Sequence, residues 1–196
     1  MPERFILCAW GSKVVIEYGK HVKTAIDILA KGLAQHKVEA LLIGGYALPA
    51  YGVMRQTVDV DCLMAETDIR ALDDILSKVG YVEKEKTENF VRYSHHSLYL
   101  MDVDVVLVDR STFEKMVKES VIYRIGKIEM RVPSLTHLIA MKLHAIKNNP
   151  ERENRDMGDI VELLKSNAGK ISATGLQSIC SRHGPEGVFA KLEGYV

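Results

Sequence analysis

The chain has 196 residues, enough for one domain with a full core or for a catalytic unit followed by a small helical appendage. Its hydrophobic share of 47% and charged share of 27% exclude a disordered or fibrous chain. Basic and acidic residues are equal in number, so the net charge of zero excludes a global field that would attract nucleic acid or an anionic membrane.

Cysteine usage and hydropathy bear on the compartment. The three cysteines, Cys8, Cys62 and Cys180, are odd in number and far apart, which fits neither a zinc module nor a disulfide framework. The adjacent His95 and His96 would face opposite sides of a strand, so we expect no zinc there. No segment resembles a secretion signal or a membrane span. A protein of the reducing cytoplasm, not inserted in a membrane, is expected.

Hydrophobic periodicity predicts mixed secondary structure in the first two thirds of the chain. Helical spacing predicts helices over 18–36, 67–79 (capped by Thr67) and 112–119, and a brief one over 46–51. Apolar runs and alternation predict strands over 38–43, 57–64 and 128–132, and two or three more between 81 and 109.

The remaining third reads as helical. Ser134 caps a predicted helix whose apolar face runs from Leu135 to Ile146, and further helices are predicted over 156–164, 174–181 and 185–192. The charged stretch 148–155 is the expected linker. The fold class is therefore α+β (mixed α/β), with a mixed sheet flanked by helices and a C-terminal helical segment. We expect a core with an N-terminal helix over 1–132 and a helical region packed on it over 133–196.

Two aspartates separated by one residue dominate the predicted strand over 57–64. On a strand Asp59 and Asp61 share a face, roughly 7 Å apart at the backbone, so their carboxylates can converge on one cation. Hard oxygen ligands favour Mg²⁺ or Mn²⁺. Asp102 and Asp104 repeat this pattern on a later strand. A D-x-D pair alone is more often a solvated strand face, but here Gly44-Gly45 ends the preceding strand.

The stretch from Leu41 to Met64 resembles the signature of the nucleotidyltransferase superfamily related to DNA polymerase β, in which a glycine turn precedes a D-x-D pair. Its R-x-T-x-D-x-D pattern is similar to the minimal nucleotidyltransferases of AbiEii-type toxin–antitoxin systems. The tail resembles the helical end of that family, a K-L-x-A helix and then a [KR]-D-x-x-D-[IL] helix. The residues that match this end are Lys142, Leu143, Ala145, Arg155, Asp156, Asp159 and Ile160.

The resemblance implies catalytic and metal-binding roles for Asp59, Asp61 and a third carboxylate, for which Asp104 matches the family pattern better than Asp102. The implied nucleotide-binding residues are Gly44, Gly45, Arg55, Thr57 and Lys142. Adjacent glycines, however, usually mark a simple turn, Thr57 could merely close that turn, and a lysine on an apolar helix often only snorkels to water. A structural role is favoured for Asp156 and Asp159, which would begin a helix.

The implied activity is transfer of a nucleoside monophosphate from a nucleoside triphosphate (NTP) to a hydroxyl acceptor, with Mg²⁺ or Mn²⁺. Implied acceptors are a protein, a tRNA or other RNA 3′ end, or a small molecule, and an antitoxin or toxin partner is expected. A homodimer stays open. The alternative is a catalytically silent interaction module, against which the retention of three carboxylates argues.

Overall fold

The computed structural model describes residues 6–9, 12–15 and 24–196. Strands β1 (Ile6–Ala9) and β2 (Ser12–Val15) form an antiparallel pair that the sequence pattern did not predict. The first part of the helix predicted over 18–36 lies outside the described residues, as does the side chain of Cys8. Cys62 and Cys180 are buried free thiols.

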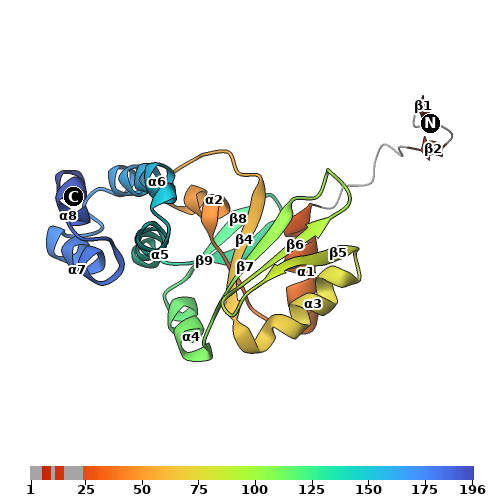
Figure 1. Ribbon diagram of the computed structural model, residues 1–196, viewed down its shortest axis with the longest axis horizontal. Coiled ribbons are helices and arrows are strands. Elements are labelled where there is room, and N and C mark those ends of the chain that lie inside the picture. The colour runs from red at the N-terminus through yellow and green to blue at the C-terminus, as the bar shows by residue number, and fades with distance from the viewer. Residues whose placement is uncertain (1–5, 10–11, 16–23) are drawn as a thin grey trace.

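A seven-stranded mixed sheet forms the centre of the molecule (Figure 1). Its strands are β3 (Leu41–Leu42), β4 (Asp59–Ala65), β5 (Tyr81–Lys86), β6 (Phe90–His95), β7 (Asp102–Val108), β8 (Val121–Ile125) and β9 (Ile128–Val132). They lie in the order β5-β6-β7-β4-β3-β9-β8, with β4/β7 and β3/β9 parallel and the other pairs antiparallel. The predicted mixed α/β class is confirmed.

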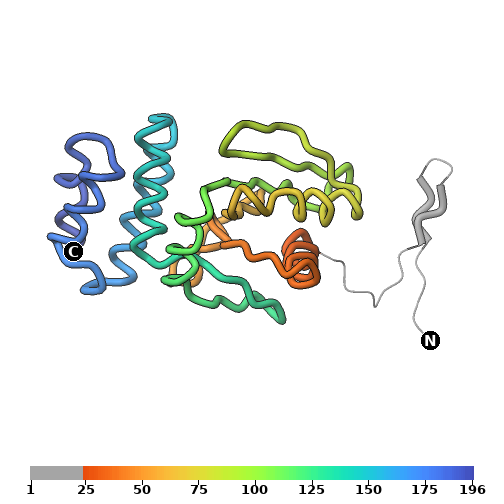
Figure 2. The backbone as a smooth tube through the Cα atoms, turned by 90° about the horizontal axis from the view of Figure 1, so that it is seen from below, coloured from red at the N-terminus to blue at the C-terminus, as the bar shows by residue number. Residues whose placement is uncertain are grey.

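Helices flank the sheet and form the C-terminal third. They are α1 (Ala25–His36), α2 (Gly44–Ala47), α3 (Ile69–Ser77), α4 (Arg110–Lys118), α5 (Leu135–Asn148), α6 (Glu153–Ser166), α7 (Ala173–His183) and α8 (Val188–Leu192). Helices α1 and α3 lie side by side against one face of the sheet, and α5–α8 stand together on the other side of the molecule (Figures 1 and 2). Among the described helices, none is both long and apolar enough to cross a membrane.

The core explains the orientation of β4. Val60, Cys62 and Met64 alternate along this strand and are buried, so the intervening Asp59 and Asp61 must point to the opposite face. Each fully buried apolar side chain contributes roughly 1.5–3 kcal/mol, which strongly disfavours a one-residue slip of the strand.

Several boundaries differ from the predictions. Ser134 caps α5 as predicted, by accepting a hydrogen bond from the His137 amide. Thr67 caps no helix, because residues 66–68 form a 3₁₀ turn and α3 begins at Ile69. The predicted linker over 148–155 is largely helical, since Asn149 caps a 3₁₀ turn that leads into α6.

Two further expectations need correction. Strand β8 was not predicted, because it lies at the sheet edge with an exposed, unpatterned sequence and is defined by pairing with β9. The rings of His95 and His96 stack with centroids 4.3 Å apart instead of facing opposite ways, because β6 ends at His95.

Candidate acidic active site

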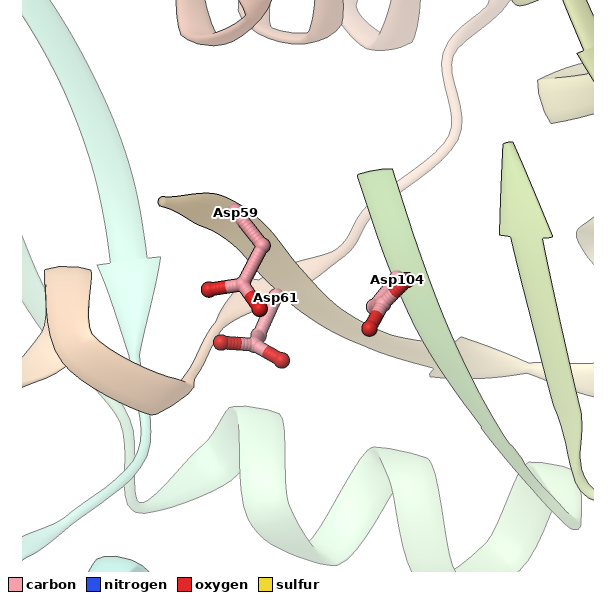
Figure 3. Close-up of side chains that lie close together, drawn as sticks. All are labelled: Asp59, Asp61 and Asp104. Carbon is pink, nitrogen blue, oxygen red and sulfur yellow. The ribbon is translucent and has the colours of Figure 1, made fainter. Parts of the chain in front are cut away.

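Three carboxylates from two neighbouring strands meet at one point. Each of Asp59, Asp61 and Asp104 offers an oxygen that lies within 4.8 Å of the others (Figure 3). The parallel register of β4 and β7 sets Asp61 beside Asp104, so both side chains project from the same face. The sheet therefore brings together the three residues predicted as metal ligands.

Asp102 shares this face but stays outside the cluster. It pairs with Asp59 in the β4–β7 register, yet the group of clustered acids comprises Asp59, Asp61 and Asp104. The Asp102 carboxylate instead acts on Tyr81 of β5, where burial first and this negative charge second raise the pKa of the phenol to about 12. The geometry thus favours Asp104 over Asp102, the other candidate for the third carboxylate.

The glycine turn fits closely against the acids. Gly44 has φ +60°, and a Cβ on it would lie 1.9 Å from Oδ2 of Asp61. A Cβ on Gly45 would lie 2.7 Å from the Cβ of Thr57. Thr57 in turn donates a 2.9 Å hydrogen bond from its hydroxyl to Oδ1 of Asp59. Both glycines and Thr57 therefore shape the acid cluster directly.

The electrostatics of the cluster disfavour three negative charges in the metal-free protein. Burial, and then the negative charges of Asp59 and Asp104, raise the pKa of Asp61 to about 6, against an opposing effect of Arg152 and Arg155. A cation among the three carboxylates would remove this repulsion. The set of oxygen donors suits Mg²⁺ or Mn²⁺ rather than a softer metal.

Arg92 of β6 grips the third carboxylate. Its Nε and Nη2 donate hydrogen bonds of 2.7 and 2.6 Å to the two oxygens of Asp104. The two residues face each other directly in the β6–β7 register. Sequence analysis did not identify Arg92, because its relation to Asp104 depends on that register.

Lys142 and Arg55, the two basic residues that were predicted to bind the nucleotide, belong to an ion-pair network with two buried aspartates of α6. The Lys142 ammonium is 2.5 Å from Asp159 and 3.2 Å from Asp156, and all three residues are buried. Arg55 contacts Asp159 at 3.2 Å, and Arg152 contacts Asp156 at 2.8 Å. Lys142 therefore does not snorkel to water. Asp156 and Asp159 have the structural role expected of them, through ion pairs rather than through the helix dipole alone.

A separate cavity lies away from the acids. It has a volume of about 510 Å³ and is lined by residues of α7, α8 and the end of α5, including Cys180 and Phe189. Figure 1 shows α7 and α8 at the end of the molecule remote from β4 and β7. None of the clustered carboxylates Asp59, Asp61 and Asp104 lines this cavity.

Comparison with protein families gives one match. A protein-family model described as an uncharacterised nucleotidyltransferase matches residues 16–191. No curated protein matches the sequence.

Solved structures share the fold at low sequence identity. The antibiotic-resistance factor ANT(2″)-Ia has a TM-score of 0.65 at 14% identity, over 87% of this chain and 94% of that one. The lincosamide antibiotic adenylyltransferase LnuA has a TM-score of 0.53 at 12% identity, over 71% and 94% of the two chains. For a nucleotidyltransferase-like protein from Paracoccidioides brasiliensis the TM-score is 0.54 at 15% identity, over 87% and 90%. These similarities support the fold.

Proposed function

Because the chain belongs to a family described as uncharacterised nucleotidyltransferases, we propose that it transfers a nucleoside monophosphate from an NTP to a hydroxyl acceptor with the help of divalent metal ions. The observation that carries the proposal is the convergence of Asp59, Asp61 and Asp104 within 4.8 Å beside the glycine turn.

The three aspartates would hold Mg²⁺ or Mn²⁺. When bound, such a metal would neutralise the charge that develops on the phosphate oxygens during transfer. In the reaction the acceptor oxygen bonds to the α-phosphorus, and the bond to pyrophosphate breaks. Asp104 is the carboxylate that we propose to take the proton from the acceptor hydroxyl.

We propose that the triphosphate lies along the Gly44–Gly45 turn, where the absence of side chains lets the phosphates approach the backbone. Positive charge stands nearby, because Arg152 and Arg155 act electrostatically on Asp61. The nucleotide-binding roles of Arg55, Thr57 and Lys142 stay predictions. Since Arg55 and Lys142 share Asp159, contact with a phosphate would require one of these ion pairs to open.

The acceptor would approach over two exposed loops. Met54 and Val58 precede β4 and are 82% and 83% exposed, while Leu98 and Tyr99 precede β7 and are 101% and 88% exposed. Because β4 and β7 are parallel, both loops lie at the same end of the sheet, where these two strands begin and the acids lie (Figure 1). Large exposed apolar side chains that lie close together are typical of a binding surface.

We favour a small hydroxyl compound with an apolar portion as the acceptor. ANT(2″)-Ia was solved with adenylyl-2″-tobramycin and LnuA with lincomycin, both small molecules. An RNA 3′ end or a protein would bring a larger surface to these two loops. A toxin–antitoxin partnership rests on the sequence resemblance and stays a prediction. A homodimer stays open, because no sequence feature supports it.

The proposal is tested by incubating the purified protein with α-labelled ATP, CTP, GTP or UTP, Mg²⁺ and a fractionated small-molecule extract. Label should move to an acceptor with the wild-type protein and fail to move with Asp59→Ala and Asp61→Ala. A folded wild-type protein that binds NTP in calorimetry but transfers no label to small molecules, RNA or protein would favour the silent interaction module instead.

A further inference from the structure

The cross-strand pair of Arg92 and Asp104 joins the acid cluster to β6. The pair is bidentate, with one nitrogen of Arg92 on each oxygen of Asp104. The Asp104 side chain is 8% exposed and that of Arg92 is 42% exposed, so the carboxylate is shielded while the guanidinium is open to solvent.

Arg92 is itself held in place. It lies directly opposite Asp104 in the antiparallel register of β6 and β7, and its guanidinium lies 5.6 Å from the ring centroid of Phe90, two residues earlier on the same face. A planar fork fixed in this way defines the rotation of a carboxylate, which a lysine ammonium at the same position cannot do.

We propose that Arg92 is a positioning residue for the third metal ligand. It holds the Asp104 carboxylate in the orientation needed for the cluster, and its charge limits how tightly the three acids bind a divalent cation. The inference rests on the proposed function, because positioning matters only if Asp104 takes part in metal binding and transfer.

Two variants distinguish the effect of the bidentate guanidinium geometry of Arg92 from the effect of its positive charge. Arg92→Lys keeps a positive charge but loses the bidentate geometry, whereas Arg92→Gln loses both. Removing a charge near a divalent site in largely aqueous surroundings is expected to tighten binding about 10-fold. Arg92→Gln should therefore bind Mn²⁺ about 10-fold more tightly at pH 8 and low salt, and Arg92→Lys should bind it within about 3-fold of wild type.

The rate of nucleotidyl transfer should fall in both variants, although neither is expected to lose Mn²⁺ affinity. With Asp104 free to rotate, both variants should lower kcat at least about 10-fold while the KM for NTP changes little. Loss of a merely structural contact would weaken Mn²⁺ binding and transfer together. Free Mn²⁺ is measured by electron paramagnetic resonance on the full chain without nucleotide, and folding by urea unfolding in EDTA.

A matched control exists elsewhere in the sheet. Arg124 and Glu129 also face each other across an antiparallel pair, β8–β9, and are joined by hydrogen bonds, but they belong to no acid cluster. Arg124→Gln should leave Mn²⁺ affinity and kcat unchanged. If wild type binds Mn²⁺ and Arg92→Gln behaves like Arg124→Gln, the positioning role is refuted while the proposed function stands. If the wild-type protein binds no Mn²⁺, both the positioning role of Arg92 and the proposed function are refuted.

Discussion

At the scale of single residues, two aspartates on β7 that are alike in sequence context differ in surroundings. Asp104 joins Asp59 and Asp61 and is buried, whereas Asp102 lies outside the cluster and is only half-buried. Side chains that alternate on one strand share a face, but their distance to a neighbouring strand depends on twist and rotamer.

Substitution of these two residues provides a paired test. Asp104→Asn should reduce nucleotidyl transfer at least about 100-fold, because a metal ligand and the proposed proton acceptor are lost. Asp102→Asn should keep activity within about 3-fold of wild type. Steady-state kinetics with both variants measures the difference, and equal losses would contradict the assignment of Asp104.

The raised pKa of Asp61 predicts a pH dependence of stability. Its pKa of about 6 in the folded protein exceeds its ordinary value of 3.8, so between these values the folded state binds more protons than the unfolded state. Ionisation of Asp61 therefore lowers the free energy of unfolding of the metal-free protein, by up to about 3 kcal/mol, as the pH rises from about 4 to 6.

Urea unfolding in EDTA at several pH values tests this prediction. The wild-type free energy of unfolding, relative to Asp61→Asn, should be highest below pH 4 and should fall until about pH 6. Asp74→Asn, on the exposed side of α3, is the control and should follow wild type. A constant difference between wild type and Asp61→Asn over this range would show that the cluster does not strain Asp61.

At the scale of elements, the turn between β3 and α2 lies against the acid cluster, and the loops before β4 and β7 form the proposed acceptor surface. The turn needs glycine for two reasons, a positive φ and the contact with Asp61. Gly126, in the turn between β8 and β9, has the same φ of +60° but has nothing within 4 Å of an added Cβ. Comparing substitutions of Gly44 and Gly126 therefore distinguishes the cost of a positive φ from the cost of a steric clash with Asp61.

Gly44→Ala should abolish Mn²⁺ binding and transfer, because its methyl group would displace the Asp61 carboxylate. Gly126→Ala should cost only about 1–2 kcal/mol of stability, the cost of a left-handed conformation for alanine, and should leave activity intact. Urea unfolding and Mn²⁺ binding measure both effects. Normal Mn²⁺ binding by a folded Gly44→Ala protein would show that the turn tolerates a side chain.

The loop before β7 is expected to contact the acceptor. The double variant Leu98→Ser, Tyr99→Ser should raise the KM for the acceptor at least about 5-fold and leave the KM for NTP unchanged, since these side chains are exposed and contribute little to stability. Ile122→Ser, on the edge strand β8, is the control, because Ile122 is also exposed, at 61%, and lies away from this loop. An unchanged acceptor KM in the double variant would exclude this loop from acceptor binding.

At the scale of the whole molecule, buried ion pairs connect the C-terminal helices to the chain that enters β4. Lys142 of α5 pairs with Asp156 and Asp159 of α6, and Asp159 also contacts Arg55, which stands four residues before Asp59. These ion pairs join α5 and α6 to the segment that leads into β4, and the division into a core over 1–132 and a helical region over 133–196 stays a prediction.

Lys142→Met should destabilise the protein by about 3–5 kcal/mol, because buried carboxylates lose a partner. Lys165→Met removes an exposed pair with Glu162 and should cost less than about 1 kcal/mol. Urea unfolding gives both values, and the KM for NTP separates two roles of Lys142. An unchanged KM in a folded Lys142→Met protein would contradict the nucleotide-binding role predicted from sequence.

The sequence by itself determined the fold class, most of the helices and strands, and Asp59 and Asp61 on one face of a strand after a glycine turn. These features depend on local periodicity, on turn chemistry and on a motif of contiguous residues, all of which can be read along one segment. The local failures included Thr67 as a cap, at a 3₁₀ turn, the missed strand β8, at an exposed sheet edge, and the linker expected over 148–155.

Only the tertiary structure brought Asp104, and not Asp102, close to Asp59 and Asp61, paired Arg92 with Asp104, and buried Lys142 between two aspartates. Each of these depends on which strands or helices become neighbours and in what register, and residues many positions apart carry no local signal of that pairing. The physical reason is that the long-range packing of the core sets the register, and the register then determines which charges meet.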